Sequence, residues 1–228
     1  MMEQVFLWNE EYEGIGGIEF PLLRTLSIKE CPKIIVIGSN QNNSEGSSNN
    51  AHIDHNHSSP LFSQQQKISF GSLKKLIITG NDRSMSLFSS SIAANLVGLT
   101  VLSISKCDEM VQVIQDEEKK KGVIGGDQNT LLFHNLEELE LKDLRKLVSF
   151  CEWNCDIVLP SLIQVVIDEC PDMKYFTSGP LSAPDLKFVN INGDHFGGLN
   201  DLNDTLQQHY LAQEQAKISP WDSYLYQT

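Results

Sequence analysis

A cluster of histidines is the first group in this sequence whose residue types could carry chemistry. His52, Asp54, His55 and His57 stand in the run HIDHNH, and imidazoles beside a carboxylate are ligands that transition metals accept. The run lies in a tract rich in serine and asparagine, without flanking structure that would fix a coordination geometry. We therefore favour a solvated low-complexity segment and predict no metal site.

Two cysteines and three glutamates are further candidates. Cys151 and Cys155 in CEWNC could bind zinc, but no second cysteine pair or histidine follows at zinc-ligand spacing, so we expect free thiols. Glu137, Glu138 and Glu140 could act as acids or bases, but they lie on or just before a predicted strand, without a cleft or partner acid. We interpret them as surface residues and predict no catalytic residue.

Two glycine-rich runs resemble phosphate-binding loops only in composition. GIGG at 14–17 and GVIGG at 122–126 lack a strand before and a helix after them, and no GK[ST] occurs anywhere in the chain. We expect no nucleotide loop and no cofactor, and hence a protein that is not an enzyme.

The strongest pattern is a template of apolar residues that closes on a cysteine. In LPSLIQVVIDECPDM it consists of Leu159, Leu162, Val165, Ile167, Cys170 and Met173. FPLLRTLSIKECPKI and LVGLTVLSISKCDEM repeat every offset, and FGSLKKLIITGNDRSM, FHNLEELELKDLRKL and APDLKFVNINGDHF repeat most of them. The position of the cysteine, here called the slot, holds Cys31, Asn81, Cys107, Leu144, Cys170 and Asp194 in chain order.

This template, L-x-x-L-x-L/I-x-x-C/N, is the signature of a leucine-rich repeat. Apolar residues separated by one position lie on one face of a short strand, because side chains alternate between faces. The slot residue then turns inward, where Asn or Cys can bond the loop backbone, whereas Leu144 can fill the slot but not bond there. We predict an α/β leucine-rich-repeat solenoid, a curved right-handed stack with a short parallel β-sheet on its concave face.

The spacing of the copies gives the predicted domain organisation. We expect a lead-in at 1–19, about six coils over 20–196 with loop insertions at 38–60 and 116–130, and a cap helix and tail at 197–228. The first insertion lies in a gap of 50 residues between copies, which could alternatively hide a degenerate coil. Asn200 or Asp201 can cap a helix whose Leu202, Leu206 and Tyr210 share one face over the last coil.

Composition and charge narrow the class of protein. A formal net charge of −13 argues against nucleic acid as a partner. No stretch is long and apolar enough for a transmembrane helix, and the first residues are acidic rather than signal-like. The five cysteines are odd in number and three occupy the slot, which suits a reducing compartment. We expect a cytoplasmic protein whose slot cysteines are buried, while Cys151 and Cys155 are more accessible.

Four segments resemble the C-terminal repeats of plant intracellular immune receptors, the nucleotide-binding leucine-rich-repeat proteins of the coiled-coil class. They are FPLLRTLSIKECPKI, LTVLSISKCDEMVQVIQDEE, LEELELKDLRKLVSFCEW and LPSLIQVVIDECPDMKYFTSG. The tail GDHFGGLNDLNDTLQQHYLAQ is similar to that family's ending. The chain shows no P-loop, nucleotide-binding domain or coiled-coil signalling domain, so we expect the sensor end of a receptor alone.

The resemblance implies a non-catalytic recognition and autoinhibitory module in defence. Its partner would be a pathogen effector, a guarded host protein or the receptor's own nucleotide-binding domain. A free-standing leucine-rich-repeat scaffold or substrate adaptor is the alternative, but the 19 residues before the first repeat are too short and polar for an F-box-like segment.

Outward strand residues are the expected protein contacts. Ile77, Val101, Val166 and Phe188 are apolar where water is expected, which is typical of contact sites; covering by other repeats or loops is the other interpretation. The predicted contacts are Lys75, Ile77, Val101, Ser103, Glu138, Glu140, Gln164, Val166, Phe188 and Asn190.

Overall fold

The structure is a computed structural model that describes residues 22–30, 60–62, 70–116, 130–197 and 201–217. The HIDHNH run, both glycine-rich runs, Cys31 and the predicted lead-in lie outside the described residues. Most of the predicted insertions at 38–60 and 116–130 also lies outside the described residues. The predicted domain limits therefore stay predictions.

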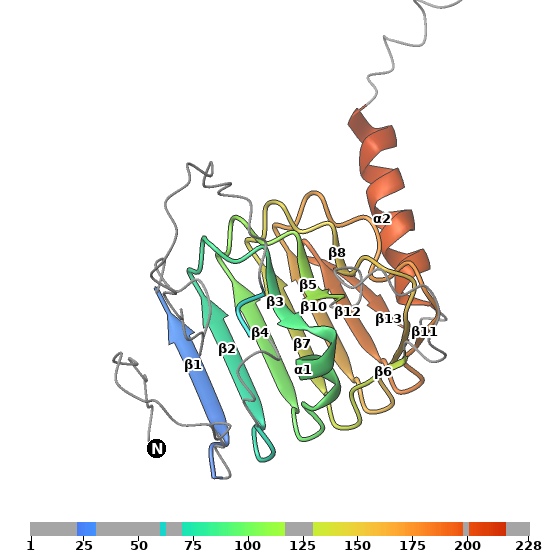
Figure 1. Cartoon of the computed structure of the whole chain (residues 1–228). Helices are drawn as coiled ribbons and strands as arrows, with labels where there is room; N and C mark the ends of the chain where they lie inside the picture. Colours follow the sequence, from blue (N-terminus) through green and yellow to red (C-terminus); the bar gives the residue numbers. More distant parts are fainter. Residues whose placement is uncertain (1–21, 31–59, 63–69, 117–129, 198–200, 218–228) are drawn as a thin grey trace, which may run out of the picture.

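A seven-stranded sheet forms one side of the molecule, and its strands lie side by side in chain order (Figure 1). All neighbouring pairs are parallel except the last, which is an antiparallel hairpin. The strands are β1 (Thr25–Lys29), β2 (Lys75–Thr79), β4 (Val101–Ser105), β7 (Glu138–Lys142), β10 (Gln164–Asp168), β12 (Phe188–Ile191) and β13 (Asp194–Gly197).

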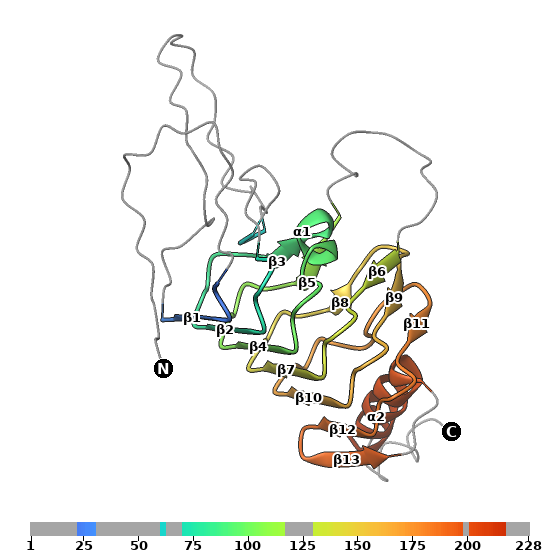
Figure 2. The ribbon, with the colours of Figure 1, turned by 90° about the horizontal axis from the view of Figure 1, so that it is seen from below.

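Two smaller parallel sheets lie on the other sides (Figure 2). One contains β3 (Ser86–Ser89), β5 (Gln112–Gln115) and β8 (Ser149–Cys151); the other contains β6 (Thr130–Leu132), β9 (Asp156–Val158) and β11 (Leu181–Ser182). Helix α1 (Ser90–Ala94) follows β3, and α2 (Leu202–Lys217) ends the described chain. From β4 and again from β7, the chain passes through all three sheets before it returns to the large one. This α/β arrangement of mostly parallel sheets is compatible with a leucine-rich-repeat fold.

The core is built from the alternation that the template predicts. Within β2, Leu76 and Ile78 are buried, while Lys75, Ile77 and Thr79 face outward. The same pattern holds in every parallel strand of the large sheet, and the register places equivalent residues side by side. The inward residues form two continuous apolar rows, Leu26, Leu76, Leu102, Leu139, Val165 and Val189, and Ile28, Ile78, Ile104, Leu141, Ile167 and Ile191.

A left-handed residue follows each parallel strand of the large sheet, and after β2, β4, β7 and β10 the residue behind it is buried. Gly80 has φ 70°, and Glu30, Lys106, Asp143 and Glu169 have φ between 51° and 54°. After each of the first four strands, the N–H of the left-handed residue donates to the last carbonyl of the next strand. Lys106, for example, donates to Lys142 at 3.1 Å. The ladder between strands thus continues into the turns.

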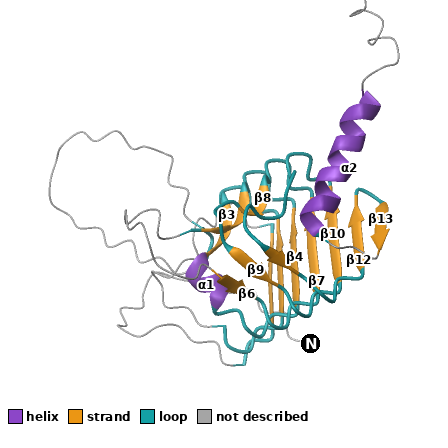
Figure 3. Cartoon of the chain, turned by 90° about the vertical axis from the view of Figure 1, so that its right-hand side faces the viewer, coloured by secondary structure: helices purple, strands orange, loops and turns teal. Residues whose placement is uncertain are grey.

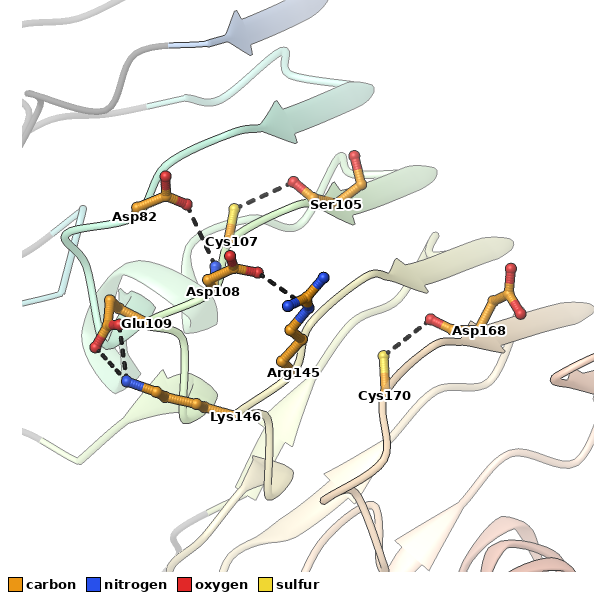
Figure 4. A network of polar contacts seen from close by, with 9 residues as sticks. All are labelled: Asp82, Ser105, Cys107, Asp108, Glu109, Arg145, Lys146, Asp168 and Cys170. Carbon is orange, nitrogen blue, oxygen red and sulfur yellow. Dashed lines mark hydrogen bonds and ion pairs between the residues drawn. The ribbon is translucent and has the colours of Figure 1, made fainter.

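The slot residues of the four central repeats lie in the interior. Asn81, Cys107, Leu144 and Cys170 are each at most 1% exposed. The side-chain oxygen of Asn81 accepts from the N–H of Ser84 at 3.1 Å. The thiols donate to backbone carbonyls, Cys107 to Ser105 and Cys170 to Asp168, both at 3.3 Å (Figure 4).

Asp194 does not occupy an inward slot, which corrects the prediction for the last copy. Asn192 and Gly193 are both left-handed, with φ 51° and 89°, the combination that closes a two-residue hairpin. The chain therefore reverses into β13, and Asp194 begins that strand as an exposed residue. After β10, the N–H of Glu169 has no strand-end carbonyl in the described chain to donate to. The side-chain oxygen of Asn192 takes that place and accepts from this N–H at 2.9 Å.

β1 pairs directly with β2, so no described strand lies between them in the large sheet. Leu61 and Phe62 add a further rung beside β3: the N–H of Phe62 donates to the Leu87 carbonyl at 2.8 Å. The alternative of a degenerate coil in the first long gap falls on residues 31–59, outside the described residues. At the C-terminal ends of the two predicted insertions, Pro60 is buried and Thr130 begins β6.

Helix α2 packs on the end of the molecule near β12 and β13 (Figure 3). Its Leu202, Leu206 and Tyr210 are buried, as the shared face predicts. The carboxylate of Asp201 accepts from the N–H of Asn203 at 2.6 Å, and the Tyr210 hydroxyl donates to the Cys170 carbonyl at 2.7 Å. Across the described ranges, no helix is long and apolar enough to cross a membrane.

Candidate functional site

The cysteines of the described chain are packing residues rather than reactive groups. Cys107, Cys151, Cys155 and Cys170 are all free and at most 1% exposed. The expectation that Cys151 and Cys155 are more accessible is therefore wrong, because both side chains belong to the apolar core. No group of three or more possible metal-ligating side chains occurs within the parts that the structure describes.

Burial also suppresses ionisation of three of these thiols. It raises the pKa of Cys107 and of Cys170 to about 11, since a thiolate would lose its hydration there. A hydrogen bond with Cys155, together with burial, raises the pKa of Cys151. Thiolates are the reactive form of cysteine, so Cys107, Cys151 and Cys170 carry no nucleophile at neutral pH. The same hydrogen bond lowers the pKa of Cys155, whose thiol is nevertheless buried.

The outward side chains of the large sheet form a continuous surface, here called the outer face. The in-register pairing arranges it in three rows that cross the strands. The first row is Thr25, Lys75, Val101, Glu138, Gln164 and Phe188; the second is Ser27, Ile77, Ser103, Glu140, Val166 and Asn190; the third is Lys29, Thr79, Ser105, Lys142 and Asp168.

All ten predicted contact residues lie in the first two rows, and their role in contacts stays a prediction. Lys75, Glu138, Gln164 and Phe188 are exposed, and the other six are half-buried. Phe188 is 60% exposed. Its neighbour on β13 is Gly197, which offers no side chain to cover the ring.

The centre of the outer face neutralises its own charge. Lys142 donates to Glu140 at 2.5 Å, and the Ser103 hydroxyl donates to the same carboxylate at 2.6 Å. The hydrogen bonds from Lys142 and Ser103 lower the pKa of Glu140, and the carboxylate raises the pKa of Lys142. Sequence reasoning placed Glu140 and Ser103 outward but missed this network, because strand alternation does not reveal which outward side chains pair.

A further row lies at the rim, just before the strands begin. Lys74 and Glu137 are exposed there, as is Arg24 before β1. The backbone carbonyl of each rim residue accepts two N–H groups from the next repeat: the Lys74 carbonyl accepts from Thr100 and Val101 at 2.7 and 3.0 Å. Sequence reasoning missed the rim as a surface because these residues precede the alternating segment, although their constant position in the template is a usable signal.

Polar contacts at the opposite edge link successive repeats (Figure 4). Lys146 contacts Glu109 at 2.7 Å, and Arg145 lies 3.9 Å from Asp108. All four side chains are about half exposed or more, and such pairs contribute little to stability. These ion pairs therefore link neighbouring repeats weakly, and this edge is not the candidate binding site.

A polar pocket of about 360 Å³ lies between α2 and the turn after β10. Glu169, Lys174, Tyr210 and Gln213 are among its lining residues. The Tyr210 hydroxyl is already bonded to the Cys170 carbonyl, and burial raises the pKa of this phenol. The pocket brings together no nucleophile and base, so the outer face remains the candidate site.

Comparison with known proteins identifies the repeats. The model of the family described as plant disease resistance protein RPS2-like, leucine-rich repeats, matches residues 47–182, which is more than half of the chain. No curated protein and no solved structure matches this chain. The matched range contains β2 to β10 and thus most of the outer face. The chain belongs to the RPS2-like leucine-rich-repeat family of plant disease resistance proteins.

Proposed function

We propose that this chain is a non-catalytic protein-recognition module, the sensor and autoinhibitory region of a plant innate immune receptor. Membership of a disease-resistance repeat family supports a protein-interaction role in defence. The finer assignment is a curved right-handed solenoid, C-terminal in a cytoplasmic nucleotide-binding receptor of the coiled-coil class. Its partner is a pathogen effector, a guarded host protein or the receptor's own nucleotide-binding domain.

The observation that carries the proposal is the composition of the outer face. Six parallel strands in register present polar and charged side chains together with Ile77, Val101, Val166 and Phe188. Outward apolar side chains on a regular sheet leave area that a protein partner can bury. On the proposed solenoid this surface is the concave side.

The test compares two surfaces of the same protein. The tagged full chain is expressed in leaves, and the plant proteins that it retains are quantified by mass spectrometry. The double variant Val166→Arg/Phe188→Arg should lose the partners that the wild type retains, because two cations would be buried against them. The control, Asp156→Arg/Ser182→Arg, changes exposed residues of β9 and β11 and should retain them. Equal retention by both variants, or no retained protein at all, would contradict the proposal.

A further inference from the structure

Five exposed charged residues form two clusters near the starts of strands in the large sheet. Arg24, Lys74 and Lys75 lie at β1 and β2, and Glu137 and Glu138 lie at β7. The two clusters together sort opposite charges to either side of β4.

Backbone hydrogen bonds fix the separation of the clusters. The Arg24 carbonyl accepts from the N–H groups of Lys74 and Lys75, at 2.8 and 2.9 Å. The Thr100 carbonyl in turn accepts from Glu137 and Glu138, at 2.9 and 3.1 Å. The basic residues of β2 and the acidic residues of β7 therefore flank β4, and they are about 10 Å apart, since neighbouring strands are spaced by roughly 4.8 Å.

None of these five side chains makes a hydrogen bond or ion pair within the described part of the chain. Glu140 and Lys142, a few ångströms further along β7, satisfy one another at 2.5 Å. The cluster residues have no such bonded partner, and Lys75 interacts with Glu140 only through its charge. Their arrangement therefore adds no hydrogen bond or ion pair to the described fold.

An apolar residue lies between the clusters. Val101 stands next to Lys75 on one side and Glu138 on the other, in the first row of the outer face. It is half-buried, as is Ile77 in the second row. We call Arg24, Lys74, Lys75, Val101, Glu137 and Glu138 the charge-split strip.

We infer that the charge-split strip binds a segment of a partner protein with the opposite order of charges. An acidic group of the partner pairs with Lys74 and Lys75, a basic group pairs with Glu137 and Glu138, and an apolar side chain between them covers Val101. This inference rests on the proposed function and specifies the partner for that surface.

A helix fits these dimensions. At 1.5 Å per residue, side chains at positions i and i+7 are about 10.5 Å apart on one face, with i+3 and i+4 between them. An acidic residue at i, a leucine at i+4 and a lysine at i+7 would match the strip. A polyanion such as nucleic acid or an acidic membrane does not, because Glu137 and Glu138 would repel it.

Three helical peptides of equal length provide the test. The mixed peptide carries two glutamates, a central leucine and two lysines one heptad later; the other two carry glutamate or lysine at all four charged positions. Binding to the full chain is measured by fluorescence anisotropy at about 0.15 M salt, where long-range attraction is screened. The wild type should bind the mixed peptide about tenfold more tightly than either uniform peptide, the effect of a few favourable charge pairs.

Charge reversal of one cluster at a time should redirect this preference. Lys74→Glu/Lys75→Glu leaves Arg24 as the one cation of the strip beside four glutamates and should favour the all-lysine peptide. Glu137→Lys/Glu138→Lys should favour the all-glutamate peptide. The control for the first variant is Arg83→Glu/Lys106→Glu, which causes the same change of net charge at exposed positions near the opposite ends of the strands and should keep the preference for the mixed peptide.

The outcomes separate this inference from the function on which it rests. If the wild type shows no preference for the mixed peptide, or binds none, the inference is wrong, while loss of plant partners in the Val166→Arg/Phe188→Arg variant would still support the proposed function. If neither set of variants changes retention or peptide preference, both fail. A melting temperature equal to that of the wild type verifies that each variant is folded.

Discussion

At the scale of single residues, the slot shows how one position can accept different side chains. Cys107 and Cys170 donate weakly to carbonyls, Asn81 accepts from a turn amide, and Leu144 only fills space. All four are buried to the same degree, so packing is the shared requirement and hydrogen bonding is additional. This explains why cysteine, a small residue that tolerates burial, recurs there without redox chemistry.

Gly179 is a residue whose substitution should reveal how closely successive repeats approach. A Cβ at this position would overlap the carbonyl oxygen of Cys155 and lie 2.7 Å from its carbon. Gly179→Ala should therefore lower the free energy of unfolding by about 2–3 kcal/mol, since backbone atoms must shift. Gly71→Ala is the matched control, because nothing lies within 4 Å of its Cβ position. Urea denaturation measures both, and identical midpoints would refute the packing described for Gly179.

At the scale of elements, the start of helix α2 is attached through the polar side chain of Asn203. The Asn203 side-chain oxygen accepts from the N–H groups of Phe176 and Thr177 at 2.7 and 3.2 Å, and its amide donates to the Thr177 carbonyl at 3.0 Å. These backbone groups belong to buried residues with no strand on that side in the described chain. Asn203 therefore replaces the rung that a further repeat would supply.

Asn203→Ala should destabilise the protein although alanine favours helix. Leaving buried amides without an acceptor costs about 1–3 kcal/mol, which exceeds the gain in helix propensity of about 0.7 kcal/mol at most. Gln207→Ala, at an exposed position of α2, should be neutral or slightly stabilising. Thermal unfolding monitored by circular dichroism distinguishes them. A melting temperature of Asn203→Ala equal to that of Gln207→Ala would show that α2 is not held in this way.

The elements also show which structural features are predictable from sequence. The strands of the large sheet follow from Leu and Ile two positions apart, because alternation is a local property. Strands such as Leu181–Ser182 are too short to show a period and form only because neighbouring repeats offer a ladder. The hairpin at Asn192 and Gly193 was predictable in principle, since Asn-Gly is a hairpin signal, but the repeat template masked it.

The candidate site likewise has features that a single strand predicts and features that depend on several stacked repeats. Outward positions such as Ile77 and Val166 follow from alternation, and the structure places them on the outer face. The proximity of Lys75 to Glu138 depends on the register of three strands from distant parts of the sequence. Alternation within one strand does not show this proximity, and it becomes visible only when the repeats are aligned on the template and stacked in that register.

At the scale of the whole molecule, the two ends of the large sheet differ. The hairpin and α2 cover the end near β12, where Val189 and Ile191 are at most 1% exposed. At the other end, Leu26 and Ile28 of β1 are 8% and 7% exposed, against 1% and 0% for the equivalent Leu76 and Ile78. Leu22 beside them is 89% exposed. The β1 end of the described structure therefore presents the less completely covered apolar layer.

We predict that the chain self-associates through the β1 end. Apolar area left in water costs about 25 cal/mol per Å², so an interface that removes a few hundred Å² gains several kcal/mol. Sedimentation velocity should show concentration-dependent oligomers, and Leu22→Glu should shift the population towards monomer. Val97→Glu is the control, because Val97 is also exposed, at 47%, but precedes β4 in the middle of the sheet. A wild-type monomer at all concentrations, or an equal effect of both substitutions, would mean that the apolar layer at the β1 end is not an association surface.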